Sequence, residues 1–159
     1  MKALHRYMRQ RLMDKREATL NKVLPLLECN NVFTDMADFM MTNGTQGYYS
    51  ASTRGIAVRK GLFGIGLVDT LFHEDRHYQQ HMKNKNFMIG YIKYEDDKLG
   101  YTLQHIEKDA RRYAFIQTIK YIKNSSNCFM VKWLGCKIVT KLAHPFTGLH
   151  STNRKDYSK

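Results

Sequence analysis

The chain has 159 residues, and its 26 Lys and Arg side chains against 14 Asp and Glu give a formal net charge of +12. This length fits one domain with a core of its own, and the apolar content excludes a disordered chain. The basic residues are spread along the sequence, which is typical of a solvated basic surface and also attracts acidic partners, nucleic acid included. No apolar stretch approaches membrane-spanning length, so we expect no membrane partner.

The cysteines argue for a reducing compartment. There are three, Cys29, Cys128 and Cys136, with no Cys-x-x-Cys spacing. An odd, scattered set does not form a disulfide framework, so reduced thiols are expected. The basic N-terminal residues have no apolar run behind them and do not resemble a secretory signal. The sequence therefore predicts a cytoplasmic protein.

The first part of the chain is predicted to be helical. Apolar residues at helical spacing indicate an amphipathic helix over residues 2–27, kinked or ended by Pro25. A second, shorter helix is predicted over residues 34–41, with Thr34 as its cap and Asn43-Gly44 as its stop.

The pattern then changes to short strands. Residues 48–52 and 56–58 are rich in Tyr, Ile and Val and predict two strands joined by a turn at 53–55. The glycines of residues 61–66 lead into a helix predicted over 65–81.

The second half is predicted to be mainly helical. Its segments are a strand or helical turn at 87–92, a charged loop at 94–100, a long helix over 101–123, a last helix over 129–142, and a flexible basic tail at 146–159. Together the elements predict an α+β, mostly helical fold. We expect one domain over residues 1–145, with a core at 47–123 and a hairpin or small sheet packed on the helix at 65–81.

That helix contains the most informative motif, the pentad H-E-x-x-H at residues 73–77. His73 and His77 fall about 40° apart on a helical wheel and can bind one metal ion, most often zinc. Glu74 is then placed to take a proton from a metal-bound water. Asp69 and Gln80 fall close to the same line, where they could orient the imidazoles.

A catalytic zinc site needs a third protein ligand. Glu107 is the best candidate, because Ala110 and Ala114 share its face of the 101–123 helix and small residues allow two helices to approach closely. Asp109 is a rival, but it points about 200° away from Glu107 on a regular helix. His81 is another, but it lies about 12 Å from His73 along the helix axis.

These features resemble the gluzincin branch of the zincin metallopeptidases, and in particular its small members associated with phages and mobile elements. A short strand pair, the H-E-x-x-H helix and a later E-x-x-A at residues 107–110 follow in that order, and Gln80 completes an H-E-x-x-H-x-x-Q form. The resemblance covers about residues 47–115. Asp75 departs from it, since an apolar residue is usual there.

The resemblance implies a compact zincin-like domain that hydrolyses a protein or peptide substrate, in the host-cell cytoplasm if the protein is phage-encoded. Zinc would be held by His73, His77 and Glu107, with Glu74 as general base. Tyr101 and Tyr113 are candidates for steadying the oxyanion. The strand at 48–52 or the one at 56–59 would bind an extended peptide by edge pairing.

Two alternatives stay open at this point. One is a non-catalytic, zinc-stabilised binding module that engages an acidic host protein or nucleic acid through its basic surface. The other is a helical domain in which the pentad arose by chance.

Overall fold

The computed structural model describes residues 2–36, 45–93 and 96–125. Residues 1–121 form one compact unit, and of the second unit, residues 122–159, only the end of a helix is described. The predicted helix at 129–142, the basic tail at 146–159 and the domain end at 145 lie outside the described residues. The fold is α+β and mostly helical, as predicted.

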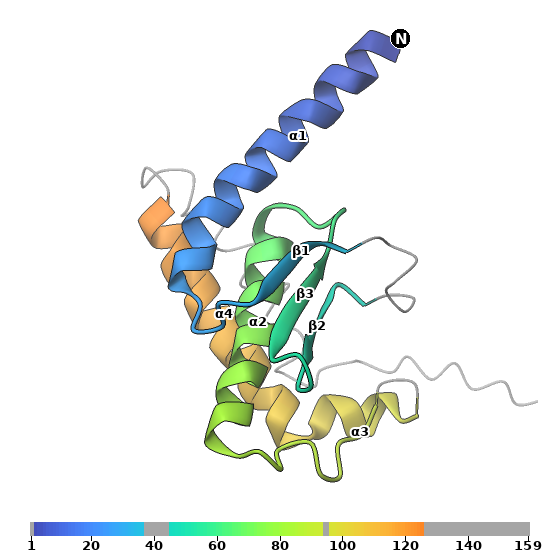
Figure 1. Cartoon of the computed structure of the whole chain (residues 1–159), viewed down its shortest axis with the longest axis vertical. Coiled ribbons are helices and arrows are strands. Elements are labelled where there is room, and N and C mark those ends of the chain that lie inside the picture. Colours follow the sequence, from blue (N-terminus) through green and yellow to red (C-terminus); the bar gives the residue numbers. More distant parts are fainter. Residues whose placement is uncertain (1, 37–44, 94–95, 126–159) are drawn as a thin grey trace, which may run out of the picture. The chain divides into compact units, whose positions relative to one another are not determined.

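The elements follow one another in a simple order (Figure 1). They are α1 (Lys2–Val23), the 3-10 turn η1 (Leu24–Leu26), β1 (Val32–Met36), β2 (Gly47–Ser50), β3 (Gly55–Arg59), α2 (Gly64–Lys83), α3 (Lys98–Leu103) and α4 (His105–Ser125). The predicted N-terminal helix is therefore confirmed up to Val23, after which Pro25 lies in the 3-10 turn. The pentad helix is also confirmed, with α2 slightly longer than predicted at both ends.

The three strands form one mixed sheet in the order β1-β3-β2. The predicted hairpin is confirmed, but its turn comes earlier than predicted: β2 runs antiparallel to β3, with Tyr48 opposite Ala57, and residues 51–54, not 53–55, make the turn. Arg54 has a φ of 48° in this turn, a left-handed conformation that lets the chain reverse before Gly55. β3 is the central strand and is buried over its first four residues.

The helix predicted to start at Thr34 is wrong over residues 34–36, which belong to β1. β1 pairs in parallel with β3, with Val32 opposite Ile56. The sequence Val32-Phe33-Thr34 is itself β-branched and aromatic, and pairing with a buried central strand outweighs the weak capping signal of Thr34. Residues 37–41 lie outside the described part of the chain.

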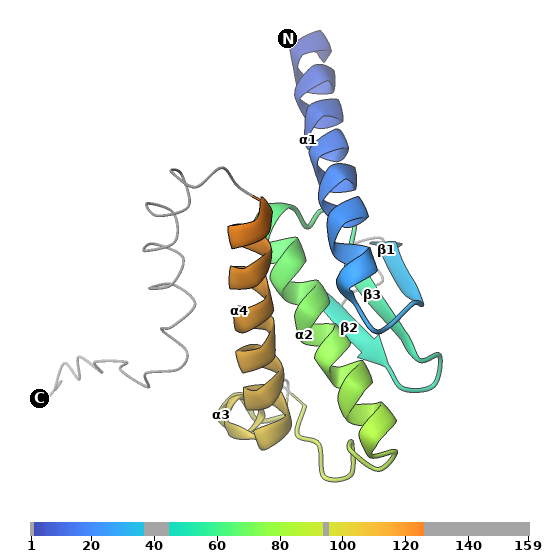
Figure 2. The ribbon, with the colours of Figure 1, turned by 90° about the vertical axis from the view of Figure 1, so that its left-hand side faces the viewer.

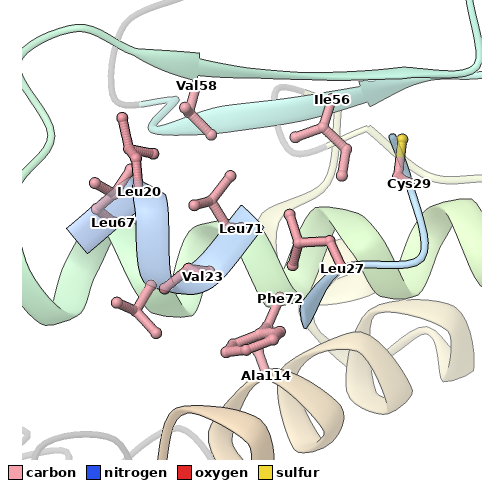
Figure 3. Close-up of a cluster of buried hydrophobic side chains, with 11 residues drawn as sticks. Leu20, Val23, Leu27, Cys29, Ile56, Val58, Leu67, Leu71, Phe72 and Ala114 are labelled. Carbon is pink, nitrogen blue, oxygen red and sulfur yellow. The ribbon is translucent and has the colours of Figure 1, made fainter. Parts of the chain in front are cut away.

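The core lies between the sheet and the helices, and α2 lies between the sheet and α4 (Figures 1 and 2). From α2, Leu67 and Leu71 pack toward Ile56 and Val58 of β3, as Figure 3 shows. The rest of the cluster comes from α2 itself, the end of α1, the loop after it and α4: Val68 and Phe72, Leu20 and Val23, Leu27 and Cys29, and Ala114. Burial of such side chains contributes about 1.5–3 kcal/mol each, so α2 is fixed on both sides.

The long helix predicted over 101–123 is interrupted. Gln104 has an extended ψ of 142° and separates α3 from α4. Its side-chain amide accepts from the backbone N–H of Ile92 at 3.2 Å and donates to the carbonyl of the same residue at 3.0 Å. Those two bonds compensate for the break and hold the 87–92 segment against the start of α4. Residues 87–90 form successive turns and residues 91–92 have no regular structure, so the predicted strand is wrong.

Candidate metal centre

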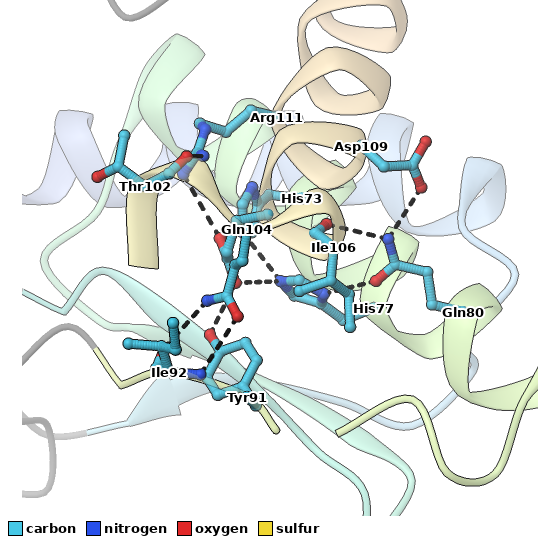
Figure 4. Close-up of polar contacts among 11 residues, drawn as sticks. His73, His77, Gln80, Tyr91, Ile92, Thr102, Gln104, Ile106, Asp109 and Arg111 are labelled. Atoms are coloured by element: carbon cyan, nitrogen blue, oxygen red, sulfur yellow. Dashed lines mark hydrogen bonds and ion pairs between the residues drawn. The ribbon is translucent and has the colours of Figure 1, made fainter. Parts of the chain in front are cut away.

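The three predicted ligands meet where α2 and the first turn of α4 face each other; His73 and His77 are labelled in Figure 4. His73 Nε2 lies 3.3 Å from Glu107 Oε2, and His77 Nε2 lies 3.2 Å from Glu107 Oε1. The two Nε2 atoms are 3.1 Å apart. Glu107, Ala110 and Ala114 form the buried face of α4 together with Thr118, so the predicted alanine-lined stripe is confirmed. These three are the only group of His, Cys, Asp or Glu side chains in the described residues that is arranged to hold a metal ion.

The protonation of His77 follows from its neighbour Gln80. The Gln80 amide nitrogen donates to the carbonyl of Ile106 at 3.0 Å and to Asp109 Oδ2 at 2.8 Å. Both partners are acceptors, so the amide cannot be turned round, and its oxygen must face His77 Nδ1 at 2.8 Å. Since an amide oxygen only accepts, His77 Nδ1 carries a proton. In the neutral imidazole the lone pair is therefore on Nε2, directed at Glu107.

The electrostatic environment favours a positive charge between His73, His77 and Glu107. Burial by itself would raise the pKa of Glu107, but the adjacent imidazoles of His73 and His77 outweigh it, and the pKa of this carboxyl is lowered. For His77, burial favours the neutral ring, yet the bond to Glu107 and the charge of Glu74 raise the pKa of the imidazole. A cation between these side chains, whether a proton or a metal ion, offsets the cost of burying Glu107.

The donor set fits a zinc ion. Oε2 of Glu107 is buried and has no hydrogen-bond partner within the described residues; besides His73, Arg111 Nη1 lies 3.6 Å from it. A buried carboxylate oxygen without a donor is costly, and a metal ion satisfies it. Ligand atoms about 2.0–2.1 Å from a tetrahedral zinc ion are about 3.3 Å apart, close to the separations of 3.1–3.3 Å measured here.

The three side chains form the end of a pocket of about 260 Å³. Glu74, which is only 7% exposed, lines the same pocket, as the pentad predicts. Tyr91 and Tyr101 line it as well. The Tyr91 hydroxyl donates to Glu107 Oε1 at 2.7 Å, and the two tyrosine rings meet edge to face. Burial, and then the negative charge of Glu107, raises the pKa of both hydroxyls, so both stay protonated.

Tyr91 was not predicted from the sequence. It lies in the turns between α2 and α3, where no periodicity signals which way a side chain points. Tyr101 lines the pocket, and its role at the oxyanion stays a prediction. Tyr113 does not line the pocket: its hydroxyl accepts from Gln79 and its ring lies under Arg76.

The rival ligands are held away from the site. Asp109 pairs with Arg76 at 2.7 Å and accepts from Gln80, so it steadies His77 indirectly. His81 Nδ1 lies 2.7 Å from the Tyr49 hydroxyl. Its ring stacks on Phe87. Asp69 bonds Thr118 at 3.4 Å and interacts with His73 only through its charge.

Asp75, the departure from the family pattern, has a structural role. Its side chain is fully buried, and Oδ1 accepts from the backbone N–H groups of Glu28 and Cys29, both at 2.9 Å. Oδ2 accepts from Gln79 at 2.9 Å. Two of these hydrogen bonds therefore connect the pentad helix to the loop after α1.

One side of the pocket is an edge of the sheet. Gly47, Tyr48 and Tyr49 of β2 line it, and β2 is an outer strand of the sheet. The alternative that residues 56–59 bind a peptide by edge pairing is wrong, because β3 is paired on both sides.

The sequence matches no protein-family model, and comparisons with curated proteins and with solved structures find no match. The resemblance to gluzincins stays a prediction that rests on the motif residues. In the part of the chain that the structure describes, no helix is long and apolar enough to cross a membrane.

Proposed function

We propose that this protein is a zinc-dependent peptide-bond hydrolase of the gluzincin kind. One observation carries the proposal: three acceptor atoms of His73, His77 and Glu107 converge at 3.1–3.3 Å in a pocket that also contains Glu74. Acceptors brought so close and partly shielded from water favour a cation between them. Two imidazoles and one carboxylate form the ligand set of catalytic zinc, which leaves one position for water or substrate.

Zinc bound there would lower the pKa of a water molecule and polarise the scissile carbonyl. The chain's own residues carry the proton transfers. Glu74 accepts the proton of the attacking water and passes it to the leaving amine. A tyrosine hydroxyl of the pocket, Tyr101 or Tyr91 once it turns away from Glu107, would donate to the negative charge that develops on the carbonyl oxygen.

The substrate is an extended peptide. β2 offers backbone donors and acceptors along one side of the pocket, and a peptide added to this edge would pair with residues 47–50. Tyr48, Tyr49 and Phe87 line the pocket next to that edge, which favours apolar or aromatic substrate side chains there.

The test replaces Glu74 with Gln. We expect the variant to bind zinc as the wild type does and to lose about 10²–10⁴-fold in hydrolysis of a fluorogenic peptide mixture, because the ligands stay while the general base is lost. Glu17→Gln, an exposed change in α1, is the matched control and should keep full activity. Equal activity of wild type and Glu74→Gln would contradict the proposal, and zinc binding without any hydrolysis in the wild type would favour the binding-module alternative.

A further inference from the structure

The N-terminal half of α1 extends past the sheet and α2 in both views of the molecule (Figures 1 and 2). Among residues 4–15 every side chain is exposed except Met13, which is half-buried. Leu4, Tyr7, Met8 and Leu12 are 49–67% exposed. A helix face this apolar and this open is unusual for a surface that meets only water.

This half of α1 is nevertheless held in place. Arg16, which is only 3% exposed, reaches under the helix, where its guanidinium donates to the carbonyls of Leu62, at 3.1 Å, and of Thr34. These bonds anchor α1 at Arg16, and the residues before it lie beside the loop that joins β3 to α2.

A groove of about 530 Å³ lies between these two parts. Its apolar lining comes from Met8, Leu12 and Met13 of α1 and from Phe63 of the loop. The remaining lining residues are His5, Arg9, Lys60 and Gly61, so the groove has basic side chains and no acidic one. Met8 and Leu12 are one helical turn apart, which matches apolar side chains spaced i and i+4 on a second helix.

We propose that this groove, called the α1 groove below, binds an acidic amphipathic helix of a partner protein. The apolar lining fits the apolar face of such a helix, and the basic side chains fit its acidic flanks. A second copy of this chain would bring like charges together, because residues 1–15 contain five Lys and Arg against one Asp. Nucleic acid would pair with the charges but would leave the apolar side chains without a partner.

The α1 groove is separate from the metal centre. Phe63 comes ten residues before His73, which corresponds to about 15 Å along α2. Binding in the groove should therefore survive Glu74→Gln and His73→Ala, so failure of this proposal can be told from failure of the proposed hydrolase activity.

The experiment selects a phage library of random 16-residue peptides on the full-length protein at physiological salt. We expect enrichment of peptides rich in Asp and Glu with apolar residues at i, i+3 or i+4, and i+7. A labelled copy of the best peptide is then titrated against variants by fluorescence anisotropy. Met8→Ser/Leu12→Ser should weaken its binding about tenfold or more, since each lost apolar contact is worth about 1 kcal/mol.

The matched controls lie on the same helix outside the groove. Leu4→Ser/Tyr7→Ser should leave the affinity within about twofold, and Arg9→Glu should weaken it more than Arg6→Glu. The proposal is overturned if no peptide is enriched, if enriched peptides lack acidic residues, or if groove and control variants bind equally. It is also overturned if an oligonucleotide or phosphatidylserine vesicles compete the peptide off the groove more strongly than unlabelled peptide does, or if the free protein dimerises through Leu12.

Discussion

The side-chain amide of Gln80 determines which ring nitrogen of His77 can bind a metal. Gln80 has both of its N–H groups bonded to acceptors, so only its oxygen is left for His77 Nδ1. The Asp109–Arg76 pair holds Gln80 in this orientation from behind. Outer partners of this kind fix the tautomer and direction of a histidine ligand.

Gln80→Met should therefore weaken zinc binding about 10–100-fold, because the imidazole loses the acceptor that keeps the proton on Nδ1. Competition with a chromophoric chelator measures the affinity. Gln10→Met, the same change at an exposed position of α1, should have no effect. An unchanged zinc affinity in Gln80→Met would show that this hydrogen bond does not position the ligand.

How far the sequence predicts single residues depends on helical periodicity. His73, His77, Gln80 and Glu107 lie on regular helices, so a wheel predicts their common face. Tyr91 follows a helix end and a glycine with a φ of 75°, after which no regular pattern exists. The hydrogen bonds that Asp75 makes could not be predicted from the sequence either, because its partners are backbone groups 46 and 47 residues away.

At the level of elements, the outer strand β2 approaches the pentad helix α2 closely at one residue. A Cβ placed on Gly47 would lie 2.7 Å from Thr70 Cγ2 of α2 and 3.0 Å from the carbonyl oxygen of Ala57. The first distance is shorter than real Cβ contacts, and the second is tighter than most of them. The absence of a side chain at residue 47 therefore lets β2 pack closely against α2, and this places β2 beside the pocket.

Gly47→Ala should destabilise the fold by about 1–3 kcal/mol, because β2 or α2 must move to make room. It should also lower kcat/KM on peptides, since the strand edge shifts. Gly61→Ala is the matched control: a Cβ there meets nothing within 4 Å, and we expect a change within about 0.5 kcal/mol. Urea unfolding measures both, and equal stability of the two variants would contradict the packing argument.

The hairpin and the pentad helix were predictable because their patterns are local. β1 was not, because its five residues become a strand only through pairing with β3, whose residues are more than twenty positions away. The break at Gln104 was missed for the same reason. Its extended backbone is stabilised by Ile92, twelve residues earlier, and a regular helical pattern runs across it.

For the molecule as a whole, a bound zinc ion would cross-link α2 and α4, the two helices that supply its ligands. Fold class and candidate ligand residues could be predicted together because the same alanine stripe buries α4 and brings Glu107 to the pentad. A ligand that binds only the folded state stabilises it by an amount set by its concentration over its Kd.

Zinc should therefore raise the Tm of the wild type, and excess chelator should lower it again. At a free zinc concentration about 100 times the Kd the stabilisation is about 2.7 kcal/mol. Differential scanning calorimetry should show no such rise in His73→Ala, while His105→Ala, an exposed histidine at the start of α4, should keep it. A rise of equal size in His73→Ala would assign the effect to zinc bound elsewhere.

The most direct test of the metal centre is a crystal structure of the zinc-loaded protein with anomalous diffraction collected at the zinc edge. We predict one strong anomalous peak within about 2.0–2.2 Å of His73 Nε2, His77 Nε2 and a carboxylate oxygen of Glu107. No peak between these three side chains, or a peak bound by other residues, would contradict the account.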